Sequence, residues 1–112
     1  MKVNSNHIVR YLREIYGCKM SCRRNCLIIE VDGEEFQVKL LTRSAKGNYI
    51  FFHVNSGNCF EDKDLAHGLF LAWNYKMYTE FGVPLEEEDW RRFVNDAYRY
   101  AEEYNVNVKS LC

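Results

Sequence analysis

Three cysteines recur at four-residue intervals near the start of the chain, and such a series could bind zinc. Cys18, Cys22 and Cys26 would supply thiolate ligands, but zinc takes four tetrahedral ligands and usually receives them as closely spaced pairs. No second pair stands out in the sequence. We therefore predict that the protein binds no metal and no cofactor, and that these cysteines are small apolar fillers near the core edge.

A cysteine near a histidine is the second candidate for chemistry. Cys59 with His53 or His67 could act as a nucleophile with its general base, if the thiol ionises and the imidazole lies within hydrogen-bond distance. The surrounding residues resemble no cysteine-hydrolase signature, and no loop suggests an oxyanion hole. We predict no catalytic residues and no enzymatic activity.

Acidic side chains gather at the start of the last predicted helix. Glu86, Glu87, Glu88 and Asp89 fill its first turn, and Asp96 follows on the same element. The helix dipole favours negative charge there, so a solvated helix start would explain the cluster. Spaced carboxylates on a rigid element can also occupy a basic groove as nucleic-acid phosphates do. These five residues are therefore candidate contacts to a basic partner protein.

The outer face of the predicted sheet is another candidate surface. Strand alternation places on it Ile28, Glu30, Gln37, Lys39, Leu41, Tyr49, Phe51 and His53. Tyr49 and Phe51 could anchor a partner protein, since exposed aromatic patches usually have a use. They could instead stack on single-stranded nucleic acid with help from Arg23, Arg24 and Lys39. In a third interpretation, the first helix covers them.

The elements that carry these side chains follow from apolar periodicity and turn signals. We expect a helix, three strands and two more helices, over 4–16, 27–31, 34–41, 48–54, 62–81 and 86–104. Gly17 fits the end of the first helix, and Asp32-Gly33 predicts a hairpin. Residues 18–26 would be a loop or a short extra strand, and 55–61 a turn with Asn58 as a helix cap.

The stretch 62–81 predicts the central helix, because it is apolar nearly all round and must be covered on more than one side. Leu65, Ala66, Leu69, Phe70, Trp73, Met77 and Phe81 form its broadest apolar face. The core face of the sheet is expected to be Leu27, Ile29, Val31, Phe36, Val38, Leu40, Ile50, Phe52 and Val54. Together these elements predict one α+β domain over 1–112, of order αβββαα, with a three-stranded antiparallel meander packed against helices.

Composition and charge add limits on partners. The net charge is −1, but residues 1–54 carry +4 and residues 55–112 carry −5. This asymmetry suggests one basic and one acidic surface. No window approaches a membrane span, and the N-terminus has no signal-peptide core, so we predict a cytoplasmic protein without membrane contact. Its five cysteines are then expected to be free thiols.

The order αβββαα, the small size, the meander and the acidic final helix resemble those of some phage-encoded anti-CRISPR inhibitors. The resemblance implies a compact protein that blocks the protospacer-adjacent-motif site of a CRISPR nuclease. It concerns element order and carries over no residue. We therefore expect a non-enzymatic protein-binding module, an inhibitor of a host defence protein that occupies a basic surface of its target. The alternative is a module that binds single-stranded nucleic acid; the oligomeric state stays open.

Overall fold

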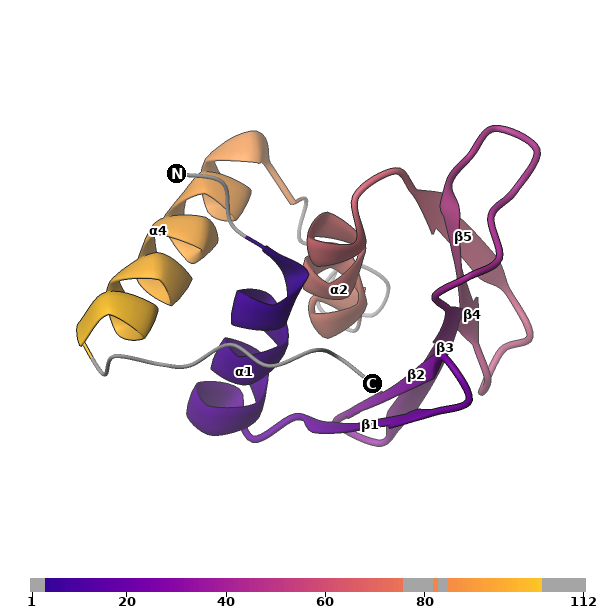
Figure 1. The fold of residues 1–112 in the computed structure, drawn as a ribbon, viewed down its shortest axis with the longest axis horizontal. Coiled ribbons are helices and arrows are strands. Elements are labelled where there is room, and N and C mark those ends of the chain that lie inside the picture. Colours follow the sequence, from indigo (N-terminus) through magenta and orange to yellow (C-terminus); the bar gives the residue numbers. More distant parts are fainter. Residues whose placement is uncertain (1–3, 76–81, 83–84, 104–112) are drawn as a thin grey trace.

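The structure, a computed structural model, describes residues 4–75, 82 and 85–103 of the chain. Its elements are α1 (Ser5–Tyr16), β1 (Lys19–Arg23), β2 (Cys26–Val31), β3 (Glu34–Lys39), β4 (Tyr49–His53), β5 (Cys59–Asp62), α2 (Leu65–Trp73) and α4 (Glu87–Glu103). The α+β class is confirmed. The prediction of a three-stranded meander is wrong in number, because the sheet has five strands in the order β1-β2-β3-β4-β5 (Figure 1).

The two additional strands lie at the edges of the sheet. β1 pairs antiparallel with β2 across a tight turn, in which Arg24 and Asn25 both adopt positive φ. β5 pairs with β4 and occupies part of the predicted turn 55–61. Asn58 is therefore not the cap of the next helix. That role belongs to Asp64, whose carboxylate accepts a hydrogen bond from the Ala66 N–H at 3.0 Å.

The boundaries of α1 follow from its own sequence, as predicted. The Asn4 side chain accepts a hydrogen bond from the Asn6 N–H at 2.6 Å and so satisfies one of the first free donors of the helix. Gly17 has a φ of 65°, and its N–H bonds back to the carbonyl of Leu12. Only glycine adopts this left-handed conformation at little cost, so the helix ends there.

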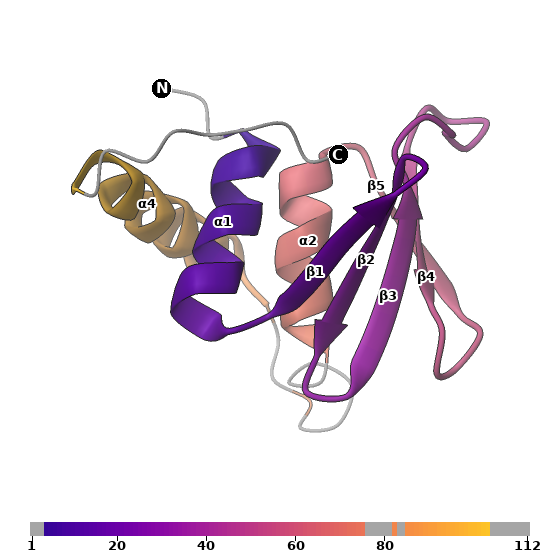
Figure 2. The same cartoon turned by 60° about the horizontal axis from the view of Figure 1, so that its bottom comes forward.

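All three described helices lie on one side of the sheet. α2 lies nearest to it, α1 is beside α2, and α4 is the outermost (Figures 1 and 2). α2 packs against α1 on one side and against β4 and β5 on the other. This confirms the expectation of a central helix packed between the sheet and another helix, but the predicted bounds are wrong: Asp62 belongs to β5, α2 begins at Leu65, and it ends at Trp73 with Asn74 as its C-cap. Met77 and Phe81, which the prediction included, lie outside the described residues.

Aromatic rings fill the space between the helices. Phe70 and Trp73 of α2 lie 5.0 and 5.2 Å from the ring of Phe93 on α4, measured between centroids. Tyr11 of α1 meets the same Phe93 ring at 5.4 Å. Leu65, Ala66, Leu69, Phe70 and Ala72 are buried, and so are Ile8, Val9, Tyr11 and Leu12 of α1. The helices and the inner face of the sheet thus share one continuous hydrophobic core.

The predicted orientation of β4 is wrong. Ile50, Phe52 and Val54 were expected to point inward, but Phe51 is fully buried and His53 is 5% exposed. Phe52 and Val54 are instead 37% and 39% exposed on the opposite face. Gly68 of α2 explains the choice, because a Cβ at that position would lie only 2.2 Å from the Phe51 ring. The missing side chain lets the ring pack directly on the helix backbone.

Candidate interaction surface

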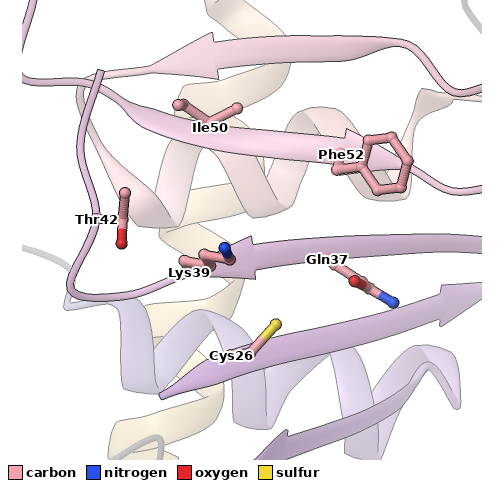
Figure 3. Close-up of a pocket in the computed structure, with 6 residues that line it drawn as sticks. All are labelled: Cys26, Gln37, Lys39, Thr42, Ile50 and Phe52. Atoms are coloured by element: carbon pink, nitrogen blue, oxygen red, sulfur yellow. The ribbon is translucent and has the colours of Figure 1, made fainter. Parts of the chain in front are cut away.

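The outer face of the sheet has a shallow hollow. It encloses about 360 Å³ and is lined by Cys26, Gln37, Lys39, Thr42, Ile50 and Phe52. Figure 3 views it with the strands in front and the helices behind, and the side chains come from β2, β3, β4 and the loop after β3. The helices therefore leave this hollow uncovered.

Strand register explains why these side chains meet. Residues directly opposite each other in antiparallel strands point to the same face of the sheet. Arg23 lies opposite Cys26, and Cys26 lies opposite Lys39, which makes one row across β1, β2 and β3. Gln37 lies opposite Phe52 in the neighbouring row. The register thus places two cations and one aromatic ring on the open face.

Apolar side chains form a strip across the middle of this face. Phe52 and Val54 are exposed, while Ile28 and Ile50 are half-buried among their neighbours. The amide of Gln37 at the centre donates a hydrogen bond to Glu35 at 3.0 Å. Gln37 lies between Ile28 and Phe52 in the same row, so the apolar side chains of the strip surround one polar amide, and Glu35 borders them.

Arg23, Arg24 and Lys39, predicted as a basic group, lie together at one end of the strip. Arg23 and Lys39 belong to the same row, and Arg24 occupies the adjoining β1–β2 turn. Among the described residues, no carboxylate lies within 4.0 Å of any of the three. The positive charge of this end is therefore not neutralised within the described part of the molecule.

The two predicted aromatic anchors do not lie on the outer face. Phe51 is in the core, where its ring stacks on Phe60 with a centroid distance of 4.8 Å. Tyr49 is half-buried on the inner side of the sheet, and the guanidinium carbon of Arg43 lies 3.5 Å from its ring centroid. The exposed ring of β4 is Phe52. The sequence prediction missed it because it inverted this strand.

The acidic group predicted on the last helix has local structural roles. The Asp89 carboxylate accepts a hydrogen bond from the Glu86 N–H at 3.0 Å, which caps the helix start. Glu87 forms an ion pair with Arg91 one turn later, with an N–O distance of 3.1 Å. Glu88 is exposed, and Asp96 is half-buried rather than fully presented to solvent. Helix capping and the helix dipole therefore account for most of this cluster.

A hydrogen-bonded chain of Ser56, His53 and Glu34 has the residue types of an acyl-transfer triad. The two imidazole nitrogens of His53 lie 2.5 Å from the Ser56 hydroxyl and 2.5 Å from the Glu34 carboxylate. The Ser56 oxygen also accepts the Asn58 N–H at 3.2 Å, which holds it within its own turn. The chain ties the β2–β3 hairpin to the β4–β5 turn. We interpret it as a structural clamp that satisfies a buried histidine.

The three cysteines that were considered as zinc ligands do not lie on one face of the sheet. Cys22 points to the core side of β1 and is disulfide-bonded, whereas Cys26 lines the hollow on the other face. Cys18 is a buried free thiol, and burial raises its pKa. The expectation of free thiols throughout is therefore wrong at Cys22. Within residues 4–75, 82 and 85–103, no three His, Cys, Asp or Glu side chains could share a metal ion.

The reactive pair considered at Cys59 is also not assembled. Cys59 lies opposite the outward-facing Phe52, whereas His53 is buried on the inner face. His67 bonds instead to the Asp62 carboxylate at 2.5 Å, and the Trp90 ring meets it edge-on at 4.9 Å. Of the described residues considered as its general base, neither His53 nor His67 therefore lies beside Cys59 on the outer face of the sheet.

Two further observations complete the description. None of the helices in the described part of the chain has the length and apolar character needed to span a bilayer. Comparison with known proteins gives no match: no family model fits the chain, and no curated protein or solved structure is detectably similar to it.

Proposed function

We propose that this protein is a small non-enzymatic binding module that contacts a larger protein through the outer face of its sheet. The observation that supports this is the one-sided covering of the sheet. The helices pack on the face that carries Phe36 and Phe51, while Phe52 and Val54 stay more than a third exposed on the other face. An apolar strip with a polar rim usually marks an interaction site.

The outer face is a better candidate than the acidic start of α4. Two of the α4 carboxylates have local partners, Asp89 through capping and Glu87 through its ion pair with Arg91. On the sheet, by contrast, burial of Phe52 by a partner would remove apolar surface from water at about 25 cal/mol per Å². A surface charge pair on the helix contributes only about 0–1 kcal/mol. The apolar strip therefore offers the larger gain on binding.

Binding of single-stranded nucleic acid is the second candidate function. It is favoured by the position of Arg23, Arg24 and Lys39 beside the exposed ring of Phe52, since cations and a stacking ring are what such strands need. It predicts an affinity that falls steeply with salt. Inhibition of a host defence nuclease, which the resemblance in element order implies, stays a prediction.

A comparison of three baits tests the proposed surface. We would capture proteins from a lysate of the source cells with the wild-type chain, with Phe52→Ser and with Ile15→Ser, and quantify them by mass spectrometry. Ile15 is a matched control because it is 48% exposed but lies on α1, which packs on the opposite side of the sheet from the outer face. We expect specific proteins to be retained by the wild type and Ile15→Ser and lost from Phe52→Ser.

Two results would contradict the proposal. Retention of the same proteins by all three baits would show that the strip around Phe52 is not the contact. A parallel bait, Glu88→Lys, covers the acidic start of α4. If proteins were lost from that bait alone, the contact surface would be the helix start predicted from the sequence, and the sheet proposal would fail.

A further inference from the structure

The hollow and the basic end of the strip are adjacent, and together they restrict what the surface can hold. We infer that the outer face binds a partner segment with one apolar side chain, which enters the hollow, next to an acidic residue that pairs with Lys39 and Arg23. This inference rests on the proposed function and names the partner's chemistry at the same site.

The size of the hollow sets the first restriction. At about 360 Å³ it lies at the lower end of the range of small-molecule sites, roughly 300–1,000 Å³. Ile50 and Phe52 line it from β4, and Cys26 lines it from β2. A single aliphatic or aromatic side chain would fit such a space and would be held by burial of its apolar surface.

The charge around the hollow sets the second restriction. Lys39 lines the hollow itself, and Arg23 follows in the same row beyond Cys26. Residues directly opposite each other in neighbouring antiparallel strands lie about 5 Å apart, so Lys39 and Arg23, on either side of Cys26, have their Cβ atoms about 10 Å apart, with room for one carboxylate between their long side chains. A carboxylate next to the apolar side chain could therefore reach both cations, which have no acidic partner within the described part of the chain.

The rim on the other side argues for a peptide over a nucleic acid. Glu61 lies opposite Ile50, and Glu35 bonds the central Gln37, so carboxylates border the strip. Two or more consecutive phosphates would meet these charges, whereas a peptide can place its single carboxylate at the basic end only. Among the described residues of the β-strands, Phe52 is also the one exposed aromatic ring. Surfaces that bind single-stranded nucleic acid usually have several aromatic side chains on which successive bases stack.

Selection from random peptides tests the inference. The full chain would be immobilised and panned with a phage library of random dodecamers, and enriched peptides would be resynthesised with a fluorescent label. We expect an apolar residue beside Asp or Glu in the enriched set. Fluorescence anisotropy should then show at least roughly tenfold weaker binding to Lys39→Glu and to Phe52→Ser, because each removes one anchor.

Lys63→Glu is the matched charge control, since Lys63 is exposed just before α2 and does not line the hollow. Its affinity should stay within about twofold of the wild type, as is usual for a charge outside the contact. Circular dichroism of each variant confirms folding, which is expected because the changed side chains face solvent.

Four outcomes would overturn the inference. Enriched peptides without an acidic residue would show that Lys39 does not pair with a carboxylate of the partner. Equal affinity of the peptides for the Lys63→Glu and Lys39→Glu variants would show the same. Tighter, Lys39-dependent binding of a fluorescent fifteen-nucleotide oligo-dT would identify a nucleic acid as the occupant. A Phe52-dependent dimer in sedimentation velocity would identify a second copy. If capture from lysate depends on Phe52 but the enriched peptides lack an apolar residue beside Asp or Glu, the proposed surface stands and only the inferred chemistry of the partner is wrong.

Discussion

Replacement of Gly68 by alanine tests the packing that determines which face of β4 is buried. The added Cβ would lie 2.2 Å from Cε1 and Cζ of Phe51, about 1.2 Å closer than an ordinary contact of 3.4 Å. The ring cannot easily move, because it is fully buried and stacks on Phe60 at an interplanar angle of 2°. Overpacking of this kind lowers the unfolding free energy by about 1–3 kcal/mol. Because the Phe51 ring has little room to move, we expect a cost near the upper end of this range.

Helix propensity opposes this cost. Alanine in a helix interior is about 1 kcal/mol more favourable than glycine, so we expect a net loss of about 2 kcal/mol for Gly68→Ala. For a chain of 112 residues this corresponds to a fall in Tm of about 8 °C. Urea and thermal unfolding followed by circular dichroism would measure both quantities.

Two variants isolate the contact. Asn95→Ala lies on the exposed side of α4 and reports the propensity gain alone, a stabilisation of a few tenths of a kcal/mol. Phe51→Leu removes the ring atoms that the new methyl group would meet. In that background Gly68→Ala should cost at least about 1 kcal/mol less than in the wild type. Stabilisation by Gly68→Ala as large as that of Asn95→Ala, or larger, would refute the inward orientation of Phe51.

Three further predictions concern other parts of the molecule. Asn4→Ala should lower the unfolding free energy by about 1 kcal/mol in urea titration, because it removes the cap of α1; an unchanged value would mean that the cap is not formed. The hydrogen bond from Tyr100 holds the pKa of Glu14 below its usual 4.5, so any stability it contributes is present above that pH and lost as pH falls through the lowered pKa. Carbon-detected NMR titration should show this pKa rise in Tyr100→Phe, and no rise would rule out the bond. Iodoacetamide should modify exposed Cys59 well before Cys18, whose burial raises its pKa, as read by peptide mass mapping; equal rates would contradict the packing of Cys18.

The parts of the fold that depend on local chemistry could be predicted from the sequence. α1 begins at a side chain that caps it and ends at a glycine with positive φ, and both signals lie within a few residues of the boundary. Strict alternation in β3 likewise separates buried Phe36 and Val38 from outward Gln37 and Lys39. For this reason the position of Lys39 on the outer face could be predicted.

The orientation of β4 could not be predicted from alternation. Its residues Tyr49–His53 are apolar or aromatic on both faces, so periodicity gives no preference. The deciding contact is long-range, between Phe51 and the backbone at Gly68. The one local hint was a glycine inside an apolar helix, which often marks close approach of another group. Because the prediction inverted this strand, it placed Phe51 rather than Phe52 on the outer face and so named the wrong aromatic anchors.

The edge strands β1 and β5 could not be predicted from the sequence for a different reason. β5 has four residues, Cys59–Asp62, and its sequence shows neither alternation nor β-branched side chains. It forms because β4 offers an open row of backbone donors and acceptors. β1 was considered as a short strand but could not be assigned, since a tight turn at Arg24 and Asn25 lacks the glycine that usually signals one.

The meander has a consequence for how the chain assembles as it is made. Every strand pairs with its sequence neighbour, so the whole sheet closes through short loops and needs no distant segment. The contact of α1 with α4 is the opposite case: Tyr100 bonds Glu14 across 86 positions. During synthesis the strands can therefore pair while α4 is still inside the ribosome, and the part of α1 that contacts α4 stays uncovered until α4 emerges, although α2 can already pack against α1.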